Sequence, residues 1–356
     1  MRCSAATAPT ERNPAVHSAP RLRSRKLTVP VFRRSSITDA FGRLSDHNDL
    51  SGGPFLLVAS TGGHLIELYR LVEMWGGAAE ASWITFDTPQ SRDLLRGLDV
   101  EFVPYVSPRD WRGVLTVARL IRRRLRRTPV AGIVSTGAAV ALSAALAGLA
   151  TRTRLLYVES IARTRGPSLT GALLQYMPGT RLRTQVAAWK SRRWRFAGSV
   201  LQGYEARPVE SQITRPRLFV TLGTIAPYRF DSLVDAVLAT GLADSTTVWQ
   251  TGSTTRTDLP GRTMESMGYL DIRNAMLQAD VVVTHGGVGT ILDCLDMGKR
   301  PVIVPRRMER GEHVDDHQLD FAKEIETSGL GTVAEAPRLT ADTLIRASGT
   351  RVELRD

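Results

Sequence analysis

Cysteine, lysine and long apolar segments are all scarce in this chain of 356 residues. Its two cysteines, Cys3 and Cys294, are too few for a disulfide framework or a zinc cluster, which favours a reducing compartment. The longest stretch without charge, residues 130–150, is mostly alanine and glycine with serine and threonine, so it predicts a buried strand and helix instead of a membrane span. Residues 1–50 have no apolar run of the kind that a secretory signal needs.

Lysine is rare because the basic residues are nearly all arginine, and they are unevenly distributed. Residues 1–50 carry a net charge of +5, residues 51–214 carry +11 and residues 215–356 carry −4. This asymmetry predicts that the first half of the chain meets an anionic surface or ligand. The arginine excess fits both a GC-rich genome and the recognition of phosphate groups. No known nucleic-acid motif accompanies the charge, so nucleic acid is not an expected partner.

The order of the apolar segments predicts two α/β domains that follow a polar tail. Residues 1–50 lack sustained periodicity and are expected to form a disordered basic tail. Strands alternate with helices across residues 51–208, and the alternation restarts across residues 215–348 after a polar linker that contains proline. Such alternation implies mostly parallel sheets with right-handed crossovers. Two Rossmann-like domains would leave a ligand cleft between the carboxyl ends of their strands.

The expected elements can be placed along the chain. In the first domain we expect strands at 55–60, 82–86, 101–105, 132–136, 154–160 and 199–203. In the second domain we expect strands at 217–223, 246–252, 262–268, 280–286, 301–306 and 331–336. Helices of the second domain are expected at about 230–240, 271–279, 288–297, 313–328 and 340–348.

The segment FLLVASTGGHLIELYRLVEMW (55–75) has the pattern of a strand, a tight turn and a helix. Gly62 and Gly63 allow the turn, and His64 is expected at or near the N-terminus of the helix. Free backbone N–H groups at that point suit an anion or a developing negative charge. A neutral imidazole there could act as a general base near pH 7. A tight turn with a capping histidine is the simpler interpretation of this motif alone.

The second domain contains two candidate phosphate-binding turns. LFVTLGT (218–224) ends a strand with Gly223 and Thr224, whose N–H groups and hydroxyl could hold a diphosphate, although it is not a dinucleotide fingerprint. ADVVVTHGGVGTILDCLD (279–296) places a glycine-rich turn between a buried strand and a helix. The polar and small residues of that turn are His285, Gly286, Gly287, Gly289 and Thr290. Asp293 follows one turn into the helix, where it could accept hydrogen bonds from ribose hydroxyls, so the motif favours a nucleotide site over simple close packing.

The segment EHVDDHQ (312–318) supplies polar side chains at the start of a helix. Asp316, His317 and Gln318 could hold sugar hydroxyls. His313 and His317 are four residues apart, which would also suit a metal ion, but no further cluster of ligands is evident. We therefore expect neither a metal nor another cofactor.

The helix WRGVLTVARLIRRRLRR (111–127) combines an apolar stripe with a high density of arginine. This combination is typical of a helix that lies on a membrane surface. It is equally typical of an outer helix whose apolar stripe packs on a sheet. The two interpretations are compatible, and an anionic membrane surface is an expected partner.

Taken in order, these motifs resemble glycosyltransferase family 28. LFVTLGT, GYLDIRNAMLQADVVVTHGGVGTILD, RPVIVP and DDHQ are similar to the C-terminal domain of that family. They most resemble the catalytic subunit of the two-subunit UDP-N-acetylglucosamine transferase of lipid-linked oligosaccharide synthesis. LLVASTGGHLIEL, ITFDTPQSRDLL, IVSTGAAVA and YVESIARTRGPSLTGALL resemble its membrane-recruiting subunit, especially the forms of bacterial exopolysaccharide and capsule clusters. The chain resembles a fusion of the two subunits.

The resemblance implies a GT-B fold, in which two Rossmann-like domains face each other across a cleft and the second holds a UDP-sugar. It assigns the diphosphate to Gly223, Thr224 and the glycine-rich turn, and the ribose to Asp293, where the family often has Glu. The donor sugar would face Asp316, His317 and Gln318, and the uracil would lie against a loop at 269–272 that begins with Tyr269 and Leu270. The acceptor would face Gly62, Gly63, His64, Glu159, Ser160, Arg163 and Ser168.

The implied activity is the inverting transfer of a sugar from a UDP-sugar to a saccharide on a polyprenyl diphosphate, in exopolysaccharide or cell-envelope glycan synthesis. His64 is the first choice for the base and Glu159 the second, and backbone N–H groups and a helix dipole would stabilise the leaving UDP without a metal. The protein would be cytoplasmic and peripheral on the inner face of the cytoplasmic membrane, with other glycan-assembly enzymes as further partners. A soluble natural-product glycosyltransferase, a sugar-nucleotide epimerase and a non-catalytic scaffold are the alternatives.

Overall fold

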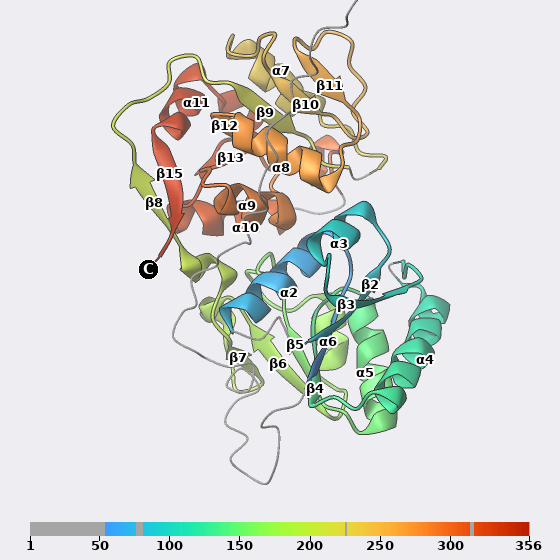
Figure 1. Cartoon of the computed structure of the whole chain (residues 1–356). Coiled ribbons are helices and arrows are strands. Elements are labelled where there is room, and N and C mark those ends of the chain that lie inside the picture. The colour runs from blue at the N-terminus through green and yellow to red at the C-terminus, as the bar shows by residue number, and fades with distance from the viewer. Residues whose placement is uncertain (1–53, 76–80, 108, 225, 314–316, 356) are drawn as a thin grey trace, which may run out of the picture.

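The computed structural model describes residues 54–75, 81–107, 109–224, 226–313 and 317–355, and these form two α/β units stacked one above the other (Figure 1). The expected tail at 1–50 lies outside the described residues. Each unit is built on a parallel sheet with helices between most successive strands. The predicted fold class, two Rossmann-like domains, is confirmed.

The first sheet has seven strands in the order β3-β2-β1-β4-β5-β6-β7, all parallel. The strands are β1 (Phe55–Ala59), β2 (Ser82–Phe86), β3 (Asp99–Val103), β4 (Gly132–Gly137), β5 (Leu155–Val158), β6 (Thr180–Thr184) and β7 (Trp194–Phe196). The helices are α2 (Gly63–Met74), α3 (Pro89–Leu94), α4 (Trp111–Arg127), α5 (Val140–Thr151) and α6 (Leu169–Leu174). The central strands β1, β2, β4 and β5 are buried along nearly their whole length because helices cover both faces of the sheet.

The second sheet has six strands in the order β11-β10-β9-β12-β13-β14, again all parallel. The strands are β9 (Leu218–Thr221), β10 (Val248–Gln250), β11 (Arg262–Met264), β12 (Val281–Thr284), β13 (Val302–Ile303) and β14 (Thr332–Val333). The helices are α7 (Asp231–Ala239), α8 (Tyr269–Gln278), α9 (Val288–Asp296), α10 (His317–Thr327) and α11 (Ala341–Ser348). All five predicted helices of this domain are therefore present, with small differences at their ends.

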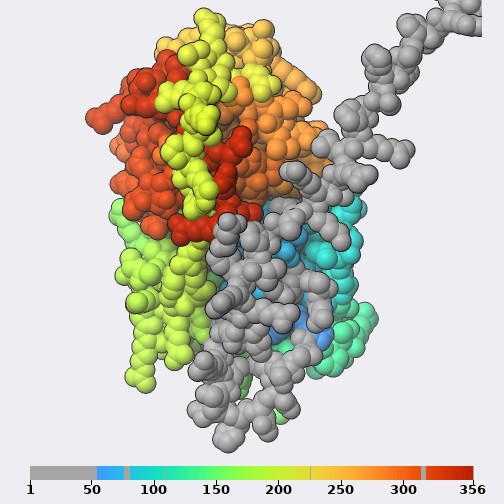
Figure 2. All heavy atoms as spheres, turned by 60° about the vertical axis from the view of Figure 1, so that its left-hand side comes forward, coloured from blue at the N-terminus to red at the C-terminus, as the bar shows by residue number. Residues whose placement is uncertain are grey.

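A two-stranded ribbon accompanies the connection between the sheets. Strand β8 (Tyr204–Pro208) pairs antiparallel with β15 (Thr350–Leu354) near the end of the chain. In Figure 2 the yellow-green connection and the red C-terminal strand run side by side over the surface. The prediction of a strand at 199–203 is wrong. Residues 200–203 form a 3-10 helix that Ser199 caps, and β8 begins directly after this helix, at Tyr204.

Helix α2 of the first domain packs along α9 of the second. Their N-terminal turns meet where Gly63 faces Gly289, and a Cβ atom placed on Gly289 would lie 3.4 Å from the Cα of Gly63 and 3.0 Å from Cδ1 of Ile66. A larger residue at position 289 would require the side chain of Ile66 to shift. Residues of both domains, including Leu65 and Ile291, belong to one buried apolar cluster. Both helices consequently begin at the same place between the sheets.

Among the described residues, no helix is both long enough and apolar enough to span a bilayer.

Candidate active site

A cavity of about 1100 Å³ lies between the domains, where the central strands of both sheets end. Most of the predicted site residues line it: Gly62, Gly63, His64, Glu159, Ser160, Arg163, Ser168, Gly223, Thr224, Tyr269, His285, Gly287, Gly289, Thr290 and Asp293. Leu270, Gly286 and Gln318 are not part of this lining. Asp316 lies outside the described residues, and so does the side chain of His317.

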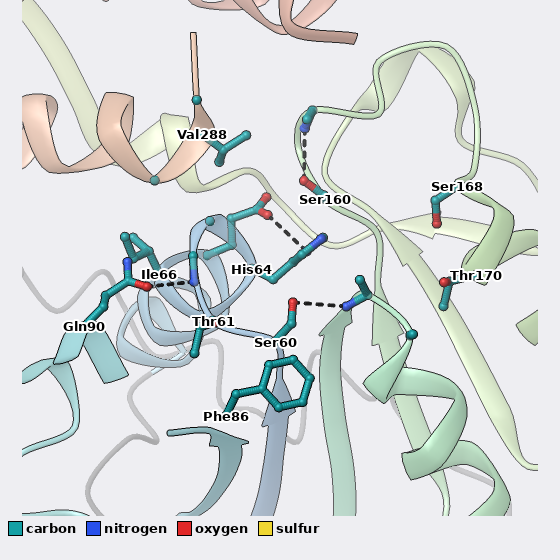
Figure 3. A pocket seen from close by; sticks show the side chains of 18 of the residues that line it. Ser60, Thr61, His64, Ile66, Phe86, Gln90, Ser160, Ser168, Thr170 and Val288 are labelled. Carbon is teal, nitrogen blue, oxygen red and sulfur yellow. Dashed lines mark hydrogen bonds and ion pairs between the residues drawn. The ribbon is translucent and has the colours of Figure 1, made fainter. Parts of the chain in front are cut away.

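His64 is the second residue of α2 and extends from the first domain into the cavity (Figure 3). Its carbonyl oxygen accepts a hydrogen bond of 2.7 Å from the hydroxyl of Thr136, which fixes the start of the helix. The imidazole lies against Gly137, where an added Cβ would be 3.2 Å from Cε1 of the ring. The side chain is 31% exposed, so the ring is both held and accessible to a substrate. The expectation that His64 stands at a helix N-terminus beside the cleft is met by this geometry.

Glu67 lies one turn along α2 and was not among the predicted site residues. Its Oε2 atom is 3.8 Å from Nδ1 of His64. Its Oε1 atom accepts hydrogen bonds from the backbone N–H of Ile161, at 2.7 Å, and from the side-chain amide of Gln185, at 3.0 Å. Burial raises the pKa of the Glu67 carboxyl to about 7. The spacing of an acid three residues after His64, on an otherwise apolar helix face, was the signal that could have identified it.

Glu159 has a different environment from His64. Its Oε1 atom accepts hydrogen bonds from the Tyr157 hydroxyl, at 3.0 Å, and from the Ser160 N–H, at 3.3 Å. Its Oε2 atom accepts from the N–H and the hydroxyl of Ser168, at 2.9 and 3.0 Å. Burial raises the pKa of Glu159. Because both oxygens are engaged, this residue ties the two ends of the loop 160–168 together, and the geometry favours His64 over Glu159 as the base.

Asp293 is buried on α9, where the second domain lines the cavity. Its Oδ1 atom accepts hydrogen bonds from the Tyr269 hydroxyl, at 3.0 Å, and from Nη1 of Arg273, at 2.9 Å. Burial raises the pKa of Asp293, while the positive charges of Arg273 and Arg70 act in the opposite direction. Arg273 was not predicted as a site residue. It reaches Asp293 because residues 269–272 are the first turn of α8 and not the predicted loop, and Leu270 in that turn is half exposed.

The glycine-rich turn leads from β12 into α9, whose first N–H groups are not capped by a side chain. These uncapped groups border the cavity at Gly287, which suits a diphosphate. His285 in the same turn is neutral, because burial and the nearby charge of Arg306 lower its pKa to about 3. The buried guanidinium of Arg306 donates to the carbonyls of Leu222, at 2.6 Å, and Tyr228, at 3.1 Å, and so holds the chain on either side of the predicted diphosphate loop.

Gln318 is buried behind the glycine-rich turn. Its Cβ lies 3.6 Å from where a Cβ on Gly286 would stand. Within the described part of the chain, its Oε1 atom has no hydrogen-bond partner. A buried amide oxygen without a donor would suit a sugar hydroxyl, but the assignment of Gln318 to the donor sugar remains a prediction.

The wall of the cavity that the first domain forms combines apolar and cationic groups. Tyr105, Trp111 and Leu169 line it and are each more than half exposed. Arg109 and Arg163 line it as well. This wall therefore suits an amphiphile that carries negative charge, and the apolar residues on it were not predicted from the sequence.

The arginine-rich helix α4 buries its apolar stripe. Val114, Val117, Ile121 and Leu125 pack into the cluster that joins the sheet to α5. The outward side of the helix carries arginines together with Trp111 and Leu115. The stripe itself is thus the packed face of an outer helix, and any membrane contact would use the arginines and these two apolar side chains.

Comparison with known proteins agrees with this arrangement. Residues 225–348, which contain strands β10 to β14, match the glycosyltransferase family 28 C-terminal domain. The mouse protein named UDP-N-acetylglucosamine transferase subunit ALG13 is 32% identical over 125 residues, which are 32% of this chain and 10% of the mouse protein. The Yarrowia lipolytica protein of the same name is 36% identical over 55 residues, 15% of this chain and 26% of that protein. The chain thus spans only a small part of the curated relatives that it matches.

Solved structures share the whole architecture at low sequence identity. Acinetobacter baumannii MurG superposes with a TM-score of 0.50 at 16% identity, over 83% of this chain and 89% of MurG. Arabidopsis thaliana UGT89C1 has a TM-score of 0.52 at 13% identity, with 83% and 90% covered. UDP-GlcNAc 2-epimerase from Methanocaldococcus jannaschii has a TM-score of 0.51 at 12% identity, with 83% and 91% covered. The chain therefore has the GT-B fold, and the match of its second domain to family 28 supports a glycosyltransferase.

Proposed function

We propose that the protein is an inverting glycosyltransferase that moves a sugar from a UDP-sugar to a saccharide carried on a polyprenyl diphosphate. One observation carries the proposal: a single cavity brings His64 of the first domain to the glycine-rich turn and Asp293 of the family 28 domain. The names of the curated relatives make UDP-N-acetylglucosamine the first donor to test. Synthesis of exopolysaccharide or another envelope glycan is the proposed setting.

In the proposed reaction, the acceptor hydroxyl attacks the anomeric carbon from the side opposite UDP. His64 takes the hydroxyl proton on Nε2, while the Glu67 carboxylate stabilises the imidazolium that forms. The uncapped N–H groups at the start of α9 stabilise the negative charge that develops on the leaving diphosphate. Holding both substrates in one cavity supplies much of the rate.

The fold alone does not distinguish transfer from epimerisation, because a UDP-GlcNAc 2-epimerase has the same architecture. The match of residues 225–348 to a glycosyltransferase domain favours transfer. The apolar wall formed by Tyr105, Trp111 and Leu169 also favours transfer, since an enzyme that acts on one sugar nucleotide has no use for such a surface. The same wall and the arginines beside it favour a lipid-linked acceptor over a small soluble one.

The direct test is a transfer assay with purified full-length protein and a panel of UDP-sugars, with and without polyprenyl-diphosphate-linked saccharides. We expect a product one sugar larger only when the lipid-linked acceptor is present, with the anomeric configuration inverted by NMR. An epimerised sugar nucleotide, or transfer to a soluble aglycone alone, would identify one of the alternatives.

Replacing Asp293 with alanine is expected to weaken UDP binding about tenfold or more, because ribose hydrogen bonds worth about 1–3 kcal/mol are lost. The substitution also leaves Arg273 without its carboxylate, so we expect a lower melting temperature as well. Calorimetric titration with UDP measures the first effect. Asp293→Asn keeps an acceptor oxygen and should lose less affinity; unchanged UDP affinity in both variants would remove Asp293 from the donor site.

We propose that α4 attaches the protein peripherally to an anionic membrane. Replacing Arg119, Arg122, Arg123 and Arg126 with glutamine should weaken binding to anionic vesicles by roughly 1 kcal/mol per charge. Arg124 is left unchanged because it pairs with Asp99. The matched control removes four exposed arginines of the second half of the chain: Arg215, Arg262, Arg338 and Arg355. Co-sedimentation across a salt series is the measurement, and equal loss in both variants would show that only net charge matters.

A further inference from the structure

The contact between α2 and α9 has a second anchor, about two helical turns beyond the glycines. Arg70 of α2 forms an ion pair with Asp296 of α9, and each side chain is only 4% exposed. The hydroxyl of Tyr204, the first residue of β8, donates a hydrogen bond of 2.5 Å to Oδ1 of Asp296. Asp296 therefore joins a helix of each domain to the connection between them. None of these three residues lines the cavity.

A buried ion pair adds little to stability, because desolvation cancels most of the attraction between the charges. It is, however, sensitive to geometry. Among the described residues, Nε and Nη1 of Arg70 have no hydrogen-bond partner, so Asp296 supplies the compensation for this buried charge. Any slide of α2 along α9 would separate the two charges inside an apolar cluster. The ion pair therefore favours one position of α2 along α9, which we call the register of the two helices, over all others.

That register determines the geometry of the site. The N-terminus of α2 carries His64, and α9 carries Asp293 and begins at the glycine-rich turn. With glycines in contact at one end and an ion pair at the other, the two helices can neither slide nor rotate freely past each other.

We infer that Arg70, Asp296 and Tyr204 are positioning residues for glycosyl transfer, which hold the base of one domain at a fixed distance from the donor site of the other. This inference rests on the proposed function. The groups that bind the donor all lie on the second domain, so loss of the register should lower the rate of transfer and leave donor binding intact.

The test is Arg70→Met in the full-length protein, compared with Tyr204→Phe and with Arg165→Gln. Arg165 forms a second ion pair between the domains, with Asp320, but its side chain is 79% exposed, and exposed pairs contribute little. We expect Arg70→Met to lower kcat at least tenfold, since a misplacement of about 1 Å can cost about 10²-fold. KM for the UDP-sugar and the affinity for UDP should stay within about threefold, because Arg273 still pairs with Asp293 when the charge of Arg70 is removed. Arg165→Gln should stay within about twofold of the parent in kcat. Tyr204→Phe keeps the ion pair and should lose about threefold to tenfold in kcat.

Normal kcat per folded molecule in Arg70→Met and Tyr204→Phe would overturn the inference. So would a parallel loss of kcat, UDP affinity and melting temperature, because that pattern belongs to a purely structural pair. Spin labels at the exposed residues Thr116 and Lys323 report the domain geometry without any assay of activity. We expect one narrow distance in the parent and in Arg165→Gln, and a broader distribution in Arg70→Met. If the parent protein transfers no sugar, the proposed function fails, while the distance measurement still decides whether Arg70 holds the register.

Discussion

Replacing His64 with alanine is expected to lower turnover by about 10²–10⁴-fold, the range for loss of a general base. His64 is held by Thr136 and Gly137 and is open to the cavity, so its ring can reach an acceptor hydroxyl. The affinity for UDP should hardly change, because the nucleotide is expected on the second domain. His64→Gln should lose a similar factor, since an amide can form a hydrogen bond but cannot take up the proton.

Turnover, UDP affinity and melting temperature should be measured on the same preparation of each variant. A structural role for His64 gives the opposite pattern, in which the melting temperature falls and each folded molecule keeps its turnover. Near-normal turnover in a folded His64→Ala protein would exclude it as the base and return Glu159 to consideration. Glu159→Gln would then need to show the larger loss, despite the four hydrogen bonds that occupy its carboxylate.

The sequence predicts the fold well where strands are buried on both faces. β1 and β12 are continuous apolar runs, and the glycines that follow them mark the turns into α2 and α9. Prediction fails where polar residues interrupt a strand. β6 has the sequence TRLRT and β15 has TRVEL, and the apolar pattern predicts neither strand. β15 also pairs with β8, a partner that lies far away along the chain.

The same division applies to the candidate site. Gly63, His64 and the glycine-rich turn are predictable because a local strand–turn–helix pattern places them at the carboxyl end of a strand. Glu67 could be identified from its position three residues after His64 on the same helix, but its burial against Ile161 and Gln185 could not. Arg273 is not predictable, because packing of α8 against α9 brings it beside Asp293. The interdomain pair of Arg70 and Asp296 depends on how two domains dock, which no local pattern encodes.

Glu67→Gln is expected to lower turnover about 10²-fold at pH 8, with a smaller loss below pH 7. The charged carboxylate near Nδ1 of His64 favours the tautomer whose Nε2 can accept a proton, and catalytic hydrogen bonds of this kind often tighten when substrate binds. A glutamine amide would instead donate to Nδ1 and place the ring proton on Nε2, where it blocks the reaction. The other titratable group that influences Glu67 is Glu159, whose negative charge acts in the same direction as burial.

The pH dependence follows from the raised pKa of Glu67. Burial raises it to about 7, so in the parent protein the carboxylate forms, and turnover rises, as the pH passes through about 7. Glu67→Gln should lack this rise. The free energy of unfolding should fall as the pH rises, because the folded protein binds this proton more tightly than the unfolded chain does. The free energy of unfolding of the parent should fall by up to about 3 kcal/mol between pH 4.5 and a pH above 7. That of Glu67→Gln should not show this fall.

The matched control is Glu101→Gln, which makes the same substitution on β3, away from the cavity lining. It should leave both turnover and the shape of the pH–rate profile unchanged. Rates should be measured from pH 6 to pH 9, and urea unfolding from pH 4 to pH 9, for the parent and both variants. A Glu67→Gln profile that runs parallel to that of the parent would show that Glu67 is only a buried support for Ile161 and Gln185. We expect Glu67→Gln to become less active than the parent but more stable than the parent as the pH rises. This result would show that the charged Glu67 destabilises the fold while it supports His64.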